Sequence, residues 1–388
     1  MSTRALRITL LLAAVFSGAC ATSRGAATTP PSTVARVAAA SRGLDTVWYI
    51  STRARVDGRD SRRLADSLEF GYVLHSHRAK GDRVAGGLDI ALEDSVRLSR
   101  AEFIAGVRAA TGGDATRDFA ALYVHGFGTS LHECWQYASE TRVRSQSRVP
   151  WISFCWPSNG AGVARPTRDA VFTGAYVNDS VAAVASQPAF VRAAEAMLEA
   201  IPAGQLMFVA HSLGSQLLGD ALGAPGALRT RLMTDRARAI VFAAPDVEVN
   251  RFADVFVPAL LPLAERTVVY VSSRDRMLSL SRARSGAVRA GANVRTPLLR
   301  AGLETVDATG GLMAEPAFQR LFGTHHALRR ASSVIFDLVH VIGARRDATC
   351  RVALGTATAR ADGVWQLTRL RPDSALLMER CRTAHGSR

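Results

Sequence analysis

The stretch Leu206–Leu222, LMFVAHSLGSQLLGDAL, decides the fold of this chain. It begins with a short apolar run, which is typical of a strand buried on both faces of a sheet. Ser212 follows one residue later, and leucines then recur at helical spacing. A strand, a sharp turn with a serine at its tip and a helix are the context of the nucleophile elbow G-x-S-x-G, although Ala210 replaces the first glycine. A second interpretation stays open, because a serine in such a loop is also typical of a helix N-cap.

Length and composition predict a globular protein. The chain has 388 residues, of which 48% are hydrophobic and 21% charged, so it can form one large domain or two ordinary ones. Its formal charge of +15 is carried almost entirely by arginine, with Lys80 the only lysine. The arginines are scattered and no nucleic-acid-binding motif occurs, so we expect no nucleic-acid partner.

The N-terminus predicts export. Arg4 and Arg7 precede the apolar run Ile8–Phe16, which is too short to span a bilayer and ends in small residues. The sequence Ser-Gly-Ala-Cys at 17–20 resembles the lipobox of bacterial lipoproteins, although Ser17 replaces the usual aliphatic residue. We therefore predict a signal peptide over 1–20 with cleavage before Cys20, lipidation of Cys20 and anchoring in the cell envelope. Ordinary cleavage after Ala21, which would give a periplasmic protein, is the alternative.

The remaining cysteines suggest one disulfide. Export permits disulfides, and Cys350 and Cys381 lie in the same C-terminal segment, where they are candidates for pairing. Cys134 and Cys155 lie in helix-like and strand-like stretches, and we expect them to be buried free thiols. No C-x-x-C motif occurs, and His75 and His77 lack a visible third ligand, so we predict no metal site and expect both histidines on the surface.

Strands and helices alternate along most of the chain. Residues 21–44 are rich in Ala, Ser, Thr and Pro and predict a flexible tether. Residues 53–120 are Arg-rich and read as irregular apart from a short strand at 71–75 and a helical pattern at 100–110, and 158–178 read as a Gly-rich loop. Apolar runs predict strands at 46–52, 121–124, 151–156, 206–210, 239–244, 267–271 and 303–306, and helical patterns cover 100–110, 131–138, 179–200 with a restart at Pro188, and 332–342.

This alternation predicts an α/β domain over 45–343, with a mostly parallel central sheet and helices on both faces. Residues 344–388 form a C-terminal extension, with a turn signal at Asp362-Gly363 that suggests a small hairpin, closed by the candidate disulfide. Ligands of such sheets bind beyond the carboxyl ends of the strands. Ser212 and several His and Asp residues fall at those ends.

A serine hydroxyl needs a base and an orienting carboxylate to act as a nucleophile at neutral pH. Ser212, Asp275 and His325 occur in the chain order nucleophile, acid, base. Asp246 is the main alternative acid and Asp307 a further one. His326 is the alternative base, because spacing alone does not separate it from its neighbour.

The same chemistry requires hydrogen-bond donors for the developing oxyanion. The N–H of Leu213, directly after the serine, is one candidate. The loop His125-Gly126-Phe127-Gly128 follows an upstream strand, and the N–H of Phe127 is the second candidate. We expect His125 to be structural, with its ring bound to loop backbone.

Six stretches together resemble a bacterial α/β-hydrolase family of unknown function, DUF900. They are YVHGFGTS, ISFCWPSNG, VAHSLG, VFAAPDVEV, VVYVSSRD and GLETVDAT, within about Val47 to Leu338. The resemblance implies the α/β-hydrolase fold, Ser212 as nucleophile and Asp275 as acid. The histidine motif of the family is usually GHSYF, whereas this chain has GTHHALR at 323–329; the distance to Asp337 favours His325.

These observations predict an exported serine hydrolase that acts on a small-molecule ester or lipid-like substrate, without metal or cofactor. The predicted reaction is hydrolysis of a carboxylic ester through an acyl-serine intermediate. An acyltransferase with the same triad is the nearest alternative. A non-catalytic cell-envelope protein that retains the fold is the alternative from another class, since fold does not dictate function.

Overall fold

A computed structural model describes residues 43–80, 87–114, 118–158, 169–292, 298–311, 321–353, 357–359, 363–368 and 381. The predicted signal peptide, Cys20 and nearly all of the predicted tether lie outside these residues. Within the described part of the chain, no helix is long and apolar enough to cross a membrane.

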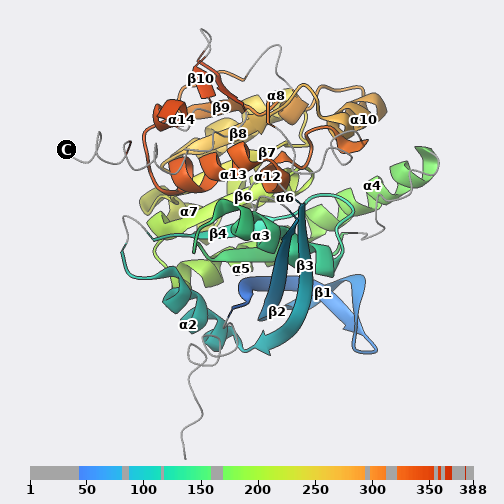
Figure 1. The fold of residues 1–388 in the computed structure, drawn as a ribbon. Helices are drawn as coiled ribbons and strands as arrows, with labels where there is room; N and C mark the ends of the chain where they lie inside the picture. Colours follow the sequence, from blue (N-terminus) through green and yellow to red (C-terminus); the bar gives the residue numbers. More distant parts are fainter. Residues whose placement is uncertain are drawn as a thin grey trace, which may run out of the picture.

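The described strands form one sheet in the order β10-β11-β9-β8-β7-β6-β4-β5-β1-β2-β3. Its strands from β11 to β1 are all parallel, whereas β10 at one edge and β2 and β3 at the other pair antiparallel (Figure 1). The strands are β1 (Asp45–Val56), β2 (Arg59–Lys80), β3 (Gly87–Leu98), β4 (Ala120–Val124), β5 (Trp151–Cys155), β6 (Leu206–His211), β7 (Ala239–Ala243), β8 (Thr267–Val271), β9 (Leu303–Asp307), β10 (Ala357–Ala359) and β11 (Trp365–Leu367).

Helices cover both faces of this sheet (Figure 1). The longer ones are α2 (Arg100–Thr111), α3 (Leu131–Ser145), α4 (Asp169–Ala185), α5 (Gln187–Ala200), α6 (Gly214–Gly223), α7 (Ala227–Thr234) and α10 (Arg276–Ser285). Shorter segments are α8 (Val249–Arg251), η2 (Phe252–Phe256), α9 (Val257–Leu260), η3 (Leu261–Leu263), α12 (Ala327–Arg330), α13 (Ser332–Phe336), η5 (Asp337–Gly343) and α14 (Cys350–Ala353). The α/β-hydrolase fold predicted from the sequence is thereby confirmed.

Two apolar cores lie on opposite faces of the sheet. Along β6, Phe208 packs into the core that contains Leu217 of α6, whereas Val209 packs into the core that contains Trp135 of α3. Successive residues of a strand point to opposite faces, so an uninterrupted apolar run is required where both faces are covered. This explains why β6 has no polar residue before His211.

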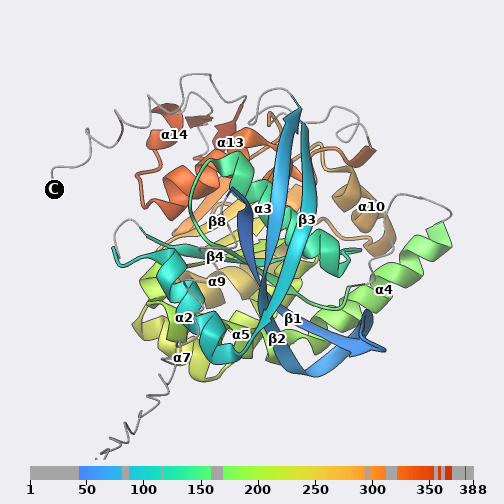
Figure 2. The same cartoon turned by 60° about the horizontal axis from the view of Figure 1, so that its bottom comes forward.

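The prediction that 53–120 are largely irregular is wrong for most of this stretch. β2 and β3 are long strands that pair antiparallel with each other, and β2 also pairs with β1. Most residues of β3 are half-buried or exposed, so its sequence lacks the apolar run of a central strand. The pair ends the sheet at this edge, and Figure 2 shows it as a long ribbon across the front of the domain. His75 lies fully buried on β2, which corrects its expected surface position.

Two further expectations concern the region before the elbow. The restart near Pro188 is confirmed, because α4 ends at Ala185 and α5 begins at Gln187. The prediction of an irregular loop up to residue 178 is wrong for its second half, where α4 begins at Asp169. Small residues such as those of α4 occur in helices as well as in loops, so the sequence does not distinguish the two. The buried side-chain contacts of α4, described below, stabilise the helix.

The disulfides differ from the expectation. Cys134 of α3 is bonded to Cys155 of β5, with their Cα atoms 5.9 Å apart, so the prediction of two free thiols is wrong. The sequence does not show that this helix packs on this strand closely enough for a bond. Cys350 and Cys381 are also bonded in the structure. Between them, β10 and β11 pair antiparallel, and β11 joins the central sheet beside β9.

Candidate active site

The turn between β6 and α6 holds Ser212 in a strained backbone conformation. Its φ is +54°, in the left-handed region that non-glycine residues rarely adopt. Neighbouring strands fix this conformation: the N–H of Ser212 donates to the carbonyl of Ala243 over 3.0 Å, and the Ser212 carbonyl accepts the N–H of Asp246 over 3.2 Å. The geometry is that of a nucleophile elbow, in which a serine stands at the carboxyl end of a central strand.

Two glycines allow the elbow to pack against the loop after β4. A Cβ atom on Gly214 would lie 2.3 Å from the carbonyl oxygen of His125, and one on Gly126 would lie 2.9 Å from Cβ of Ser212. Side chains at either position would force the two segments apart. The close approach brings the backbone around Phe127 next to the serine. Within the described residues, the N–H of Leu213 has no hydrogen-bond partner.

Asp275 and His325 form a buried hydrogen bond. Nδ1 of His325 donates to Oδ2 of Asp275 over 2.8 Å, and both residues are nearly inaccessible to solvent. The other carboxylate oxygen accepts the N–H of Leu278 over 2.9 Å, so Asp275 is the N-cap of α10. The bond orients the ring, and in the neutral tautomer that donates from Nδ1 the other nitrogen, Nε2, is the acceptor.

Backbone contacts hold the histidine loop against the loop of the acid. Gly323 pairs with Asp275 in an isolated antiparallel bridge, and the N–H of Thr324 donates to the carbonyl of Arg274 over 3.2 Å. Gly323 has a φ of +64°, and a Cβ there would lie 1.8 Å from the Arg274 oxygen. Glycine is therefore required at this position for the two loops to meet.

The alternative acid, Asp246, is engaged elsewhere. One carboxylate oxygen accepts the hydroxyl of Tyr176 over 2.7 Å. The other accepts the hydroxyl of Ser281 over 2.7 Å and lies 3.2 Å from Nε of Arg289. Both oxygens thus bind groups other than histidine. The further alternative, Asp307, accepts the N–H of Thr309 over 2.8 Å at the end of β9.

Two more histidines surround His325. His211 donates from Nε2 to the carbonyl of His325 over 2.8 Å, and their ring centroids are 4.7 Å apart. His326 packs edge-on against Phe322, with the centroids 5.3 Å apart. Burial lowers the pKa of both His211 and His326 well below the usual range, so both rings are neutral at neutral pH. Sequence reasoning missed this contact of His211, because nothing in the spacing places its ring beside residue 325.

A buried polar network fixes the loop that follows β4. Asp179 of α4 accepts the N–H of Gly128 over 2.9 Å and the hydroxyl of Ser158 over 2.7 Å. The same hydroxyl accepts the N–H of Thr129 over 2.9 Å. Arg53 of β1 donates to the carbonyls of Thr129 and Ser158 over 2.6 and 3.0 Å. Sequence reasoning missed Arg53 and Asp179, since each is far along the chain from the loop.

His125 has a structural position in the same loop. Its Nδ1 donates to the carbonyl of Gly126 over 3.0 Å, and its ring stacks on Trp156 with the centroids 4.9 Å apart. Trp156 in turn donates from its indole nitrogen to the His125 carbonyl over 2.9 Å. Burial lowers the pKa of His125 to about 3, so the ring stays neutral. Trp156 is fully buried and belongs to the core.

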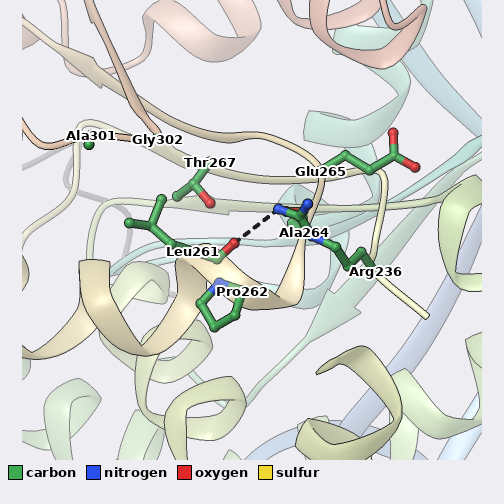
Figure 3. Close-up of a pocket in the computed structure, with 8 residues that line it drawn as sticks. All are labelled: Arg236, Leu261, Pro262, Ala264, Glu265, Thr267, Ala301 and Gly302. Atoms are coloured by element: carbon green, nitrogen blue, oxygen red, sulfur yellow. Dashed lines mark hydrogen bonds between the residues drawn. The ribbon is translucent and has the colours of Figure 1, made fainter. Parts of the chain in front are cut away.

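The described residues contain no group of three or more His, Cys, Asp or Glu side chains arranged to hold a metal ion. A pocket of about 580 Å³ lies far from Ser212, at the amino-terminal edge of the sheet, where β8 and β9 begin (Figure 3). It is lined by Arg236, Leu261, Pro262, Ala264, Glu265, Thr267, Ala301 and Gly302. Arg236 there donates to the Leu261 carbonyl over 3.2 Å, a bond within the wall of the pocket.

Comparison with known families is consistent with this geometry. A family described as "Alpha/beta hydrolase of unknown function (DUF900)" matches residues 113–315, more than half of the chain. The chain belongs to this family. The matched DUF900 region includes Ser212 and Asp275 but ends before His325, and it is shorter than the stretch from Val47 to Leu338 expected from the sequence. The strands β1, β2 and β3 lie outside it.

Beyond the DUF900 family, distant similarities to solved structures are found. No curated protein matches the chain. Similar solved structures include a predicted CIB-like hydrolase from Thermoplasma acidophilum (11% identity, 69% of this chain, 89% of that chain, TM-score 0.27) and a mutant of the esterase Est22 (14%, 80%, 82%, 0.32). Thermogutta terrifontis esterase 2 phosphorylated by paraoxon is a third (12%, 69%, 82%, 0.26). These TM-scores are too low for a comparison of sites residue by residue.

Proposed function

We propose that this DUF900 protein is a serine hydrolase that cleaves carboxylic esters through an acyl-Ser212 intermediate. The observation that carries the proposal is the 2.8 Å hydrogen bond from His325 to Asp275 in loops at the same edge of the sheet as the strained elbow. A buried histidine–carboxylate pair at the carboxyl ends of parallel strands, beside such a serine, is the arrangement that acyl transfer requires.

The chemistry follows from the protonation states. Asp275 keeps the proton of His325 on Nδ1, so Nε2 can accept the proton of the Ser212 hydroxyl as its oxygen attacks the ester carbonyl. The carbonyl oxygen becomes an oxyanion, which the N–H groups of Leu213 and Phe127 stabilise. His325 then gives its proton to the leaving alcohol. In the second half, water loses a proton to His325, attacks the acyl group and releases the acid and Ser212.

The hydrogen bonds of the rival residues support this assignment of roles. The carboxylate of Asp246 binds Tyr176, Ser281 and Arg289. The ring of His326 packs on Phe322. We therefore assign the acid to Asp275 and the base to His325, with Asp246 and His326 in supporting positions.

A fluorophosphonate probe tests the proposal, because it labels only an activated serine nucleophile. We expect the wild-type protein to be labelled and Ser212→Ala to be unlabelled. Ser215→Ala, a serine in the next turn of α6, serves as the matched control and should be labelled as the wild type is. Absence of labelling in a folded wild-type protein would favour a non-catalytic protein that retains the hydrolase fold. Labelling without ester hydrolysis, but with transfer to an added alcohol, would favour the acyltransferase.

We further propose that the protein is exported and anchored in the cell envelope through a lipid on Cys20. Two disulfides in the described residues, Cys134–Cys155 and Cys350–Cys381, support an oxidising compartment. Metabolic labelling with a fatty acid tests the anchor: the wild type should incorporate the label and Cys20→Ser should not. Release of an unlabelled wild type into the periplasm would contradict the anchor and favour ordinary cleavage.

A further inference from the structure

The outer face of α4 exposes a stripe of valines. Val177, Val181 and Val184 are 46%, 65% and 58% exposed, respectively. Their spacing of four and three residues places them on one side of the helix. From Gly174 to Ala185 the only charged residue of α4 is Asp179, which is buried on the opposite side. Isolated exposed apolar residues are ordinary, but three in line on an uncharged helix face mark an interaction surface.

The inner face of α4 fixes the position of this stripe relative to Ser212. Tyr176 donates to Asp246, whose N–H donates to the carbonyl of Ser212. Asp179 binds the N–H of Gly128, next to the candidate oxyanion donor. The ring of Tyr176 also lies 5.6 Å from that of Phe127. The valine stripe is therefore the back of the helix that borders the candidate active site.

A basic helix lies beside α4. The guanidinium of Arg284 on α10 lies 4.2 Å from the ring centroid of Tyr176, and Figures 1 and 2 show α4 and α10 side by side at the same edge of the domain. Arg274, Arg282 and Arg284 are exposed, and Leu280 of α10 is 41% exposed. The only acidic residue between 270 and 292 is Asp275, which is buried. This flank is thus positively charged with no exposed carboxylate of its own.

We propose that the α4–α10 surface, defined by Val177, Val181, Val184, Leu280 and Arg284, docks on an anionic lipid bilayer. Apolar side chains on one helix face enter the boundary between headgroups and acyl chains, and neighbouring arginines bind anionic headgroups. Charge complementarity favours this occupant over a protein partner, because the arginines form no ion pair within the described residues. The docked orientation would bring the candidate active site to the membrane surface.

The docking surface also specifies the substrate class, and that part of the inference rests on the proposed function. An ester that resides in a bilayer reaches Ser212 more often when the enzyme is held at the bilayer surface. Docking and catalysis can be measured separately, so the failure of one is distinguishable from the failure of the other.

Co-sedimentation of the full chain with vesicles tests the docking. Vesicles of phosphatidylglycerol and phosphatidylcholine are compared with vesicles of phosphatidylcholine alone. Any binding by the N-terminal segment is common to all variants, so differences between variants report on the domain. We expect the double variant Val181→Asp/Val184→Asp to bind the anionic vesicles at least about tenfold more weakly than the wild type. Arg284→Ala should bind about fivefold more weakly.

Matched controls separate docking from a general loss of apolar or charged surface. Met233 of α7 is 56% exposed and Arg192 of α5 is exposed, both on other helices. Met233→Asp and Arg192→Ala should bind vesicles as the wild type does. Hydrolysis of a short water-soluble ester should be unchanged in Val181→Asp/Val184→Asp, whereas hydrolysis of an ester embedded in anionic vesicles should fall with binding.

Two results would overturn the proposal. One is equal binding of wild type and valine variants to both kinds of vesicle. The other is a wild-type dimer that Val181→Asp/Val184→Asp converts to a monomer without any change in vesicle binding, which would make this face an interface between two copies of the chain. Absence of fluorophosphonate labelling in the folded wild type would contradict the proposed function but would leave the docking result unaffected.

Discussion

Asp275 binds His325 with one carboxylate oxygen and the first turn of α10 with the other. Oδ2 accepts Nδ1–H of His325 over 2.8 Å, while Oδ1 accepts the N–H of Leu278 over 2.9 Å. The positive end of a helix dipole stabilises a carboxylate at this position. The two bonds hold the Asp275 carboxylate in one orientation, which the proposed role requires.

Replacing Asp275 by Asn tests this role. The amide keeps the shape of the side chain but cannot stabilise the imidazolium that forms when Ser212 is deprotonated. We expect kcat for a simple aryl ester to fall about 10²- to 10⁴-fold, with little change in fold by circular dichroism. Steady-state kinetics over a range of ester concentrations measures the loss.

Asp246→Asn is the matched control. Asp246 binds Tyr176, Ser281 and Arg289 without contacting the histidine pair, so its loss should weaken packing around α4 and α10. We expect kcat to change less than about tenfold and the free energy of unfolding to fall by about 1–3 kcal/mol. A larger kcat loss in Asp246→Asn than in Asp275→Asn would reverse the assignment of the acid.

The sequence predicts part of this arrangement for a clear physical reason. Buried parallel strands need uninterrupted apolar runs, so β4, β6, β7 and β8 are visible in the sequence, and so are the polar residues that directly follow them. Spacing alone does not separate His325 from His326. In the structure, the bridge between Gly323 and Asp275 brings His325 to the acid. These two bridging residues are 48 positions apart in the chain, so the contact cannot be read from spacing.

Other features are invisible in the sequence because they depend on packing between distant segments. The disulfide between Cys134 and Cys155 requires α3 to lie on β5. The bonds from Arg53 and Asp179 to the loop after β4 join three elements that are far apart in the chain. β2 and β3 escape prediction because an outer antiparallel pair tolerates charged residues on its solvated side.

Gly323→Ala should separate the loops of the acid and the base. Its Cβ would lie 1.8 Å from the Arg274 carbonyl at a φ of +64°, so the histidine loop must move. A displacement of about 1 Å at a catalytic group costs on the order of 10²-fold in rate, and we expect kcat/KM to fall by about that factor. Gly58→Ala is the control, because Gly58 has a φ of +74° with nothing within 4 Å. It should lose about 1 kcal/mol of stability and no activity. Equal kinetics for both variants would contradict the proposed contact.

Asp179→Ala should impair the loop that carries the Phe127 N–H. The substitution removes the acceptor of both the Gly128 N–H and the Ser158 hydroxyl. We expect kcat to fall about 10- to 10²-fold with KM nearly unchanged, because the lost interactions position a donor for the oxyanion. Ser180→Ala serves as the control, since among the described residues Ser180 donates only to the Tyr176 carbonyl on the same helix. An unchanged kcat in Asp179→Ala would show that the loop keeps its position without this network.

The Cys134–Cys155 disulfide should contribute to stability but not to the chemistry. It closes a loop over a sequence separation of 21 residues, for which removal of a disulfide costs about 3 kcal/mol. We expect Cys134→Ala/Cys155→Ala to show this loss in chemical unfolding, with kcat retained in the fraction that folds. Intact mass under non-reducing conditions provides the check: the wild type, with both bonds, should be about four daltons lighter than after reduction. An unchanged mass would contradict both bonds.

Buried neutral histidines should make the protein less stable in mild acid. Burial lowers the pKa of His75 to about 4 and that of His125 to about 3, and also lowers the pKa of His211 and His326. In the unfolded chain these groups titrate near 6.5. Below about pH 6.5 the unfolded state therefore binds more protons than the folded state, so stability falls as pH falls, until each folded pKa is reached.

Each such histidine changes the free energy of unfolding by up to about 1.4 kcal/mol per pH unit within its window. Urea unfolding at pH 7.5, 6.0 and 5.0 measures the slope. His75→Gln should remove the contribution of one proton to this slope, because the amide does not titrate. His75 lies on β2, away from Ser212, so the substitution leaves the candidate active site intact. A slope that is equal in the wild type and in His75→Gln would show that His75 takes up its proton without unfolding.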